Sequence, residues 1–127
     1  MGNVHVSILS GPIVDSAPPF PSEGAGAVVC FEGRVRGLEE GRAIHGLCYE
    51  AYEPMAADML LLIGEETVGR YGLVGLSVEH SRGMVMVGEC SFRLRIAGRH
   101  RREALAAMSQ FIDRMKRDVP IWKTAIE

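Results

Sequence analysis

Apolar and polar residues alternate in several short stretches of the chain, and this pattern predicts strands. The clearest case is 89–97, where every second residue from Cys90 to Ile96 is apolar. Because successive side chains of a strand point to opposite faces, one face of this strand is expected to be buried. The stretches 26–36 and 43–53 flank the turn sequence GLEEGR and are predicted to pair as a long hairpin, with Gly33 at a bulge. The stretches 3–9 and 73–80 are also predicted strands, and 81–89 is a predicted loop or edge segment.

Two longer stretches repeat their apolar residues at helical spacing. The first opens at Pro54, which the first turn of a helix tolerates, and ends near Tyr71–Gly72. The second runs from about Arg99 to Arg117 and is stopped by the Pro that follows. The expected apolar stripes are Met55, Met59, Leu62 and Ile63 in the first helix, and Ala104, Leu105, Met108, Phe111, Ile112 and Met115 in the second.

The order of these elements indicates an α+β fold. Strands cluster and two helices separate them, which favours an antiparallel sheet with flanking helices over a doubly wound α/β sheet. A length of 127 residues fits one domain covering 1–127. No apolar run approaches the roughly 18 residues that a membrane helix needs, and the N-terminus lacks the pattern of a secretory signal. We therefore expect a cytoplasmic protein without a membrane partner.

Several kinds of chemistry have no support in the sequence. The three cysteines form no CxxC pair, so we expect no zinc site and read them as core or half-buried residues. No phosphate-binding glycine loop or Ser-His-Asp pattern is present, and we expect no cofactor. The net charge of -2 disfavours nucleic acid. The charge is uneven, however, with 7 basic and 4 acidic residues in 99–127 against 7 and 12 in 1–98.

The basic residues Arg99, His100, Arg101 and Arg102 open the second helix. A helix N-terminus already carries unpaired N–H groups and positive potential, so cations there are unfavourable by a few tenths to about 1 kcal/mol each. A bound anion would reverse this repulsion, as at many phosphate sites. A solvated basic patch explains the same residues.

Lysine is rare in this chain, which has 14 basic residues but only two lysines, Lys116 and Lys123. Unlike arginine, a lysine amine can exchange protons or act as a nucleophile. Lys116 in the last helical turn also suits the helix dipole. Lys123 has no such explanation, since it follows Pro120 and the only Trp. Arg34 and Arg36 at the hairpin form either an anion clamp or solvated edge charges.

Four segments carry a resemblance to a known family. GAVVCFEGRVRG, LCYEAYEPMA, AGRHRREAL and MKRDVPIWK, in this order, make the chain similar to the large, catalytic subunit of molybdopterin synthase over roughly residues 24–123. The resemblance implies an α/β hammerhead fold. It also implies a sulfurtransferase that converts cyclic pyranopterin monophosphate to molybdopterin. Two sulfurs would arrive as a thiocarboxylate on the C-terminal Gly-Gly of a small ubiquitin-like subunit, in a heterotetramer built on a homodimer of large subunits.

The same resemblance implies roles for particular residues. Arg36, His100 and Arg101 would hold the phosphate and pterin of the substrate, and Phe31 would line the pocket. Lys116 would lie where the thiocarboxylate tail arrives. Lys123 would lie at the reacting pterin carbons, as an acid/base or electrostatic catalyst.

The chain departs from the family pattern in two places. The motif HRIG is replaced by His80-Ser81-Arg82-Gly83, and the acidic residue expected two positions after Lys123 is Ala125. The short tail after Lys123, which lacks this acidic residue, leaves open a second hypothesis, a non-catalytic scaffold that binds the ubiquitin-like partner or a phosphorylated ligand. A nucleic-acid module is disfavoured, because no aromatic residues are interleaved with the basic patch.

Overall fold

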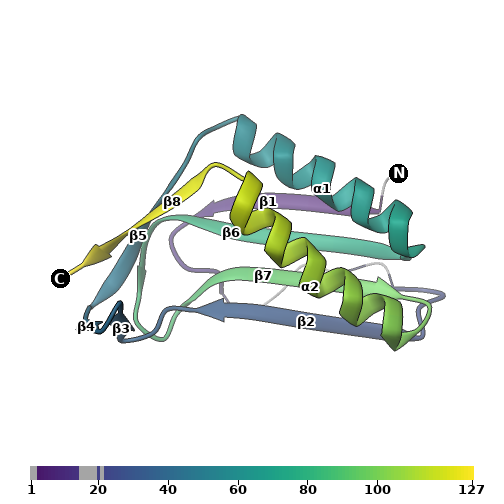
Figure 1. The fold of residues 1–127 in the computed structure, drawn as a ribbon, viewed down its shortest axis with the longest axis horizontal. Coiled ribbons are helices and arrows are strands. Elements are labelled where there is room, and N and C mark those ends of the chain that lie inside the picture. Colours follow the sequence, from purple (N-terminus) through teal and green to yellow (C-terminus); the bar gives the residue numbers. More distant parts are fainter. Residues whose placement is uncertain (1–2, 15–19, 21) are drawn as a thin grey trace.

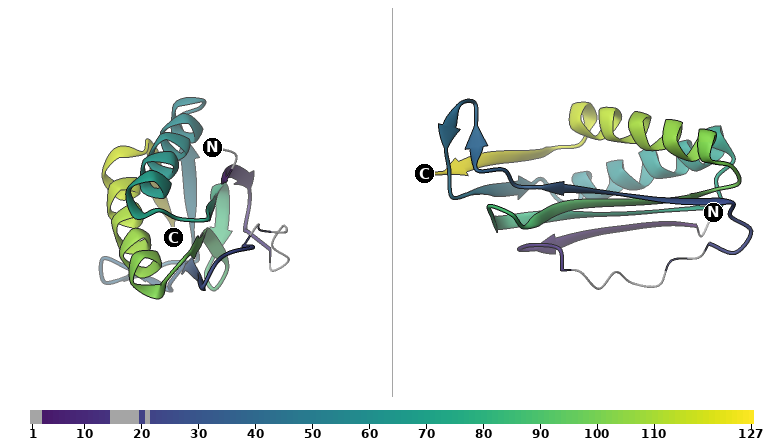
Figure 2. Two further views of the ribbon diagram at one scale, coloured as in Figure 1. Left: turned by 90° about the vertical axis from the view of Figure 1, so that its right-hand side faces the viewer. Right: turned by 90° about the horizontal axis from the view of Figure 1, so that it is seen from below.

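The computed structural model describes residues 3–14, 20 and 22–127, which form a mixed β-sheet with two helices packed on one of its faces. The sheet has the strand order β2-β7-β6-β5-β8. The remaining strand, β1, also pairs with β6. Figures 1 and 2 show α1 and α2 side by side on the same side of the strands. The bounds are β1 (Val4–Ser10), β2 (Ala27–Arg34), β3 (Leu38–Glu39), β4 (Arg42–Ala43), β5 (Gly46–Ala51), α1 (Met55–Tyr71), β6 (Gly75–Met86), β7 (Cys90–Gly98), α2 (Arg101–Asp118) and β8 (Ile121–Ile126).

The α+β class with an antiparallel sheet and helices is confirmed, with one pair of strands as the exception. β1 runs parallel to β6, whereas the other paired strands are antiparallel. The predicted long hairpin between 26–36 and 43–53 is wrong. β2 pairs with β7 and β5 pairs with β6 and β8, so only the short β3–β4 hairpin remains between them.

β6 is longer than predicted and includes most of the segment 81–89, which was expected to be a loop or an edge segment. Its first half pairs with β1 and β7, and residues 83–86 pair with β5. Gly83, with φ 81°, lies where the partner changes. A side chain rarely tolerates this left-handed backbone, which explains a glycine here. The last seven residues contain the edge strand β8.

Both helices bury a face against the sheet, although the predicted stripes need correction. α1 buries Leu60 and Ile63, while Leu62 and Met55 are exposed, because Gly64 lets the helix approach β1 and β6 closely on the buried side. α2 buries its predicted face except for Leu105, which is exposed, and Ile112, which is half-buried. The largest fully buried side chains of this core are Phe111, Leu60, Ile63, Leu76, Leu94 and Ile96.

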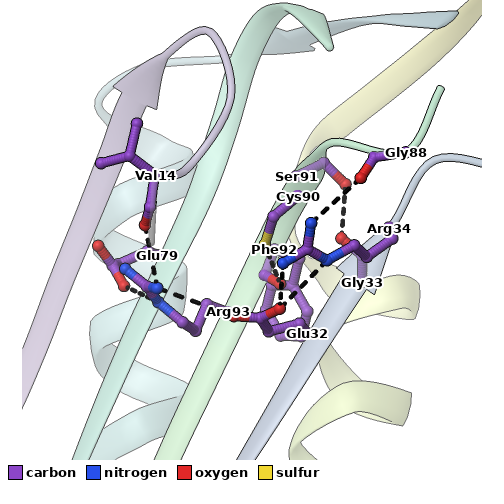
Figure 3. Close-up of polar contacts among 10 residues, drawn as sticks. All are labelled: Val14, Glu32, Gly33, Arg34, Glu79, Gly88, Cys90, Ser91, Phe92 and Arg93. Carbon is purple, nitrogen blue, oxygen red and sulfur yellow. Dashed lines mark hydrogen bonds and ion pairs between the residues drawn. The ribbon is translucent and has the colours of Figure 1, made fainter. Parts of the chain in front are cut away.

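The sheet face away from the helices carries a buried ionic network (Figure 3). Arg93 Nε donates to Glu79 Oε1 at 2.7 Å, and Arg93 Nη1 donates to the carbonyl of Val14 at 3.1 Å. Glu32 lies 3.8 Å from Arg93 and accepts from Arg34 at 2.6 Å. The network ties β2, β6 and β7 to the segment that follows β1.

The cysteines differ in exposure. Cys90 is buried, Cys48 is intermediate, and Cys30 is exposed, so the expectation of a core or half-buried residue is wrong for Cys30. Cys30 lies on the edge strand β2, opposite Arg95 on the face away from the helices. In the described part of the chain, no helix has the length and apolar character needed to cross a membrane.

Candidate functional site

A cavity of about 420 Å³ opens where the C-terminal end of α2 meets β8. The bulge between Gly33 and Arg34 ends the regular pairing of β2 here, and the chain then turns along the cavity toward β3. Four of the six predicted site residues line this cavity, namely Phe31, Arg36, Lys116 and Lys123. They come from β2, the segment after it, α2 and β8, so the fold assembles them from segments far apart in the sequence.

The two lysines approach the cavity from neighbouring elements. Met115 and Val119 anchor the end of α2 in the core, which leaves Lys116 exposed at the cavity. Lys116 has no ion pair within the described ranges. Pro120 and the pairing of β8 with β5 then bring Lys123 opposite Tyr49.

Lys123 forms an ion pair with Glu39 of β3, with 2.9 Å between Nζ and Oε2. Glu39 is the only carboxylate among the described residues that line the cavity. The β3–β4 hairpin holds β8 a second time, since Arg42 donates to Glu127 at 2.8 Å. Ala125 packs with the small apolar cluster under this hairpin, so a carboxylate at that position would be poorly solvated. Lys123 therefore takes its acidic neighbour from the hairpin instead of from its own strand.

Arg34, at the end of β2, and Arg36, in the segment after it, both line the cavity but differ in their partners. Arg34 donates to Glu32 and to the carbonyl of Gly88 at 3.1 Å. Arg36 is exposed and makes no hydrogen bond or ion pair with the described residues. Together with the lysines they place four cations against one carboxylate around the cavity. The site therefore favours an anionic ligand.

Aromatic rings form one wall of the cavity. Phe31 is 40% exposed, and its ring centroid lies 6.0 Å from that of Phe92. His80 packs between Phe92, at 5.8 Å, and Tyr49, at 5.3 Å. Tyr49 donates a hydrogen bond of 2.9 Å to Ser91. An apolar wall beside four cations suits a flat ring that carries negative groups.

Sequence reasoning assigned no role to His80, although it lines this cavity. Its exposure is only 6%, and burial lowers the pKa of its imidazole from the usual value. Its Nδ1 lies 2.8 Å from the carbonyl of Ser81. The alternation of Leu76, Val78 and His80 along β6 was the available signal, because it places the histidine on the core face below the helices.

His100 and Arg101 lie away from this cavity. They begin α2, whereas Lys116 ends it. At about 1.5 Å per residue, the fifteen residues from Arg101 to Lys116 span roughly 22 Å. His100 makes no capping hydrogen bond through its side chain, and both residues are exposed. Within one copy of the chain, they do not share a site with Arg36.

Comparisons with known proteins identify the family of the chain. A profile of the MoaE protein family matches residues 12–118. The molybdopterin synthase catalytic subunit of Pyrococcus abyssi is 33% identical over 99% of this chain and 88% of its own length. The subunit of the same name from Bacillus subtilis is 38% identical over 80% of this chain and 65% of its own length.

Two solved structures have the same fold. The molybdopterin synthase of Staphylococcus aureus superposes with a TM-score of 0.77 at 36% identity, covering 82% of this chain and 76% of that one. A complex of subunits 1 and 2 of the molybdopterin-converting factor of Helicobacter pylori gives 0.76 at 26% identity, covering 94% and 83%. By sequence and by fold, the chain belongs to the MoaE protein family.

Proposed function

We propose that this chain is the catalytic subunit of a molybdopterin synthase, a sulfurtransferase that converts cyclic pyranopterin monophosphate to molybdopterin. Two sulfurs are inserted, each delivered as a thiocarboxylate on the C-terminal Gly-Gly of a small ubiquitin-like subunit. The observation that carries this proposal is the convergence of Phe31, Arg36, Lys116 and Lys123 on one cationic cavity. The names of the relatives and the partner subunit in the Helicobacter complex support it. The cytoplasmic location expected from the sequence stays a prediction.

The chemistry of each lining residue suits a different role. Arg36 is free to hold a phosphate or pterin oxygen, because no protein carboxylate pairs with it in the described structure. Lys116 meets the incoming thiocarboxylate, whose negative charge its ammonium group attracts. Lys123 acts at the reacting carbons as an acid/base or electrostatic catalyst, held by Glu39. Phe31 provides a face on which the pterin ring stacks.

Substitutions of Lys123 test this assignment. Lys123→Ala is expected to reduce conversion by at least about 10²-fold while leaving the fold intact, because β8 keeps its backbone pairing. Lys123→Arg should not rescue activity, since a guanidinium keeps the charge but does not exchange protons at neutral pH. Arg117→Ala, at an exposed position outside the cavity, is the control. Wild-type turnover by the Arg variant would show that only charge matters at this position.

A truncated partner tests whether its C-terminal tail delivers the sulfur. A flexible Gly-Gly tail needs a cationic end point, and Lys116 lies at the cavity where such a tail would arrive. Deleting the last two glycines of the partner should abolish sulfur transfer while leaving most of the subunit contact. Undiminished transfer by the truncated partner would reject this route.

His100 and Arg101 would reach the substrate site of a second large subunit. Because they lie roughly 22 Å from the cavity along α2, a substrate site that includes them must take them from the other copy of a homodimer. Mixed dimers test this arrangement. Arg101→Ala and Lys123→Ala should each be inactive alone. Random mixing should restore roughly a quarter of the wild-type sites, because half of the dimers would carry one intact site. Mixed dimers without activity would contradict the shared site.

A further inference from the structure

His80 is a buried titratable group at the cavity that the roles above leave unused. Its Nδ1 lies 2.8 Å from the carbonyl oxygen of Ser81. A carbonyl only accepts hydrogen bonds, so in the neutral ring Nδ1 carries the proton and Nε2 has a free lone pair. The backbone thus fixes the tautomer, and the rings of Tyr49 and Phe92 hold the plane of the imidazole.

The free nitrogen remains accessible. Nε2 makes no hydrogen bond with the residues that the structure describes. It is not one of the fully buried polar atoms without a partner, so part of its surface is accessible. His80 lines the cavity. Burial lowers the pKa of the ring, so the lone pair stays unprotonated at neutral pH. Nε2 can therefore accept a proton from a molecule in the cavity.

The proposed reaction needs such an acceptor, and this inference rests on the proposed function. A sulfur bonded both to the acyl carbon of the partner's last glycine and to the pterin is a thioester. The pterin keeps that sulfur only if the bond between the acyl carbon and the sulfur breaks. Water then adds to the acyl carbon, the electron pair of the broken bond goes to sulfur, and the products are a carboxylate on the partner and a thiol on the pterin.

We propose that His80 is the general base of this hydrolysis. Nε2 takes one proton from the attacking water as the new bond between oxygen and the acyl carbon forms, and it returns that proton to the departing sulfur. The second proton of the water leaves when the new carboxylic acid ionises. Lys116 and Lys123 line the same cavity and stabilise the negative charge that develops on the acyl oxygen. His80 thus acts after carbon–sulfur bond formation.

The test is a single turnover with the thiocarboxylated partner and the pterin substrate, followed by intact-mass spectrometry of the partner. His80→Gln places a polar but non-basic group near the position of Nε2, and His80→Asn keeps a donor for the carbonyl of Ser81. Either folded variant should form product about 10²-fold more slowly than wild type. The partner should accumulate as a pterin adduct that hydroxylamine cleaves, as expected of a thioester. His45→Gln, an exposed histidine outside the cavity lining, is the matched control.

The outcomes separate this inference from the proposed function. Product formation at the wild-type rate without an adduct, by either variant, would overturn the general-base role. Loss of activity with weakened substrate binding and no adduct would also overturn it, because His80 would then only bind substrate. If the wild-type protein forms no molybdopterin, the proposed function itself fails.

Discussion

The buried ion pair between Arg93 and Glu79 gives a quantitative prediction for stability. Their side chains are 4% and 8% exposed and lie 2.7 Å apart. Removing one partner of a buried pair costs about 3–5 kcal/mol, because the other charge remains buried. Arg93 keeps its contacts with Val14 and Glu32, so we place Glu79→Gln near 3 kcal/mol, at the lower end of this range. For a chain of 127 residues, this lowers Tm by roughly 12 °C.

The matched control is Glu66→Gln on the surface of α1. Glu66 pairs with Arg114 at the same distance of 2.7 Å, but their side chains are 52% and 27% exposed. An exposed pair contributes at most about 1 kcal/mol, so Tm should fall by no more than about 4 °C. Thermal and urea unfolding of both variants gives the two values. Equal losses for Glu79→Gln and Glu66→Gln would refute the reasoning, because burial would then make no difference.

Three further predictions concern packing, pH and the site. Gly64→Ala should destabilise α1 by about 1–3 kcal/mol, because its Cβ would lie 2.7 Å from a side-chain carbon of β1, whereas Gly69→Ala in open space should stabilise the same helix by up to about 1 kcal/mol. Chemical denaturation measures both, and equal effects would contradict the packing. The pKa of His80 is lowered in the folded protein, so the unfolded chain binds more protons below about pH 6.5, the usual value for histidine. Stability should therefore be retained above pH 6.5 and fall as the pH drops below it, and His80→Gln should flatten this fall in Tm; an unchanged slope would sink the assignment. Glu39→Gln should lower kcat several-fold, because Lys123, the proposed catalyst, loses the ion pair that holds it, while Glu40→Gln in the turn of the β3–β4 hairpin should not. Indistinguishable kcat values would show that the ion pair has no role in catalysis.

The helices were predictable because their signals are local. Helical periodicity and the residues at each end placed α1 and α2 within two residues of their bounds. The pairing of strands was not predictable in this way. Proximity in sequence favoured a hairpin between the segments that became β2 and β5, but each found its partners far along the chain. The choice of strand partners depends on which sheet faces the helices cover, and no short stretch of sequence determines this.

In the site, too, the local features were predictable and the long-range contacts were not. The rarity of lysine and the basic helix start were visible in composition, and the lysines do meet Arg36 and Phe31 at one cavity. Glu39 was not predictable as a partner of Lys123, because 84 positions separate them and only the fold of the β3–β4 hairpin joins them.

Reconstitution tests directly whether this chain transfers sulfur to a pterin. The purified chain is combined with cyclic pyranopterin monophosphate and a thiocarboxylated small partner subunit, and molybdopterin is measured against the thiocarboxylate consumed. We expect molybdopterin to form, with two thiocarboxylates used for each product. Tight binding of the partner without any product, under conditions in which a relative from the same family turns over, would contradict the account and favour the scaffold hypothesis.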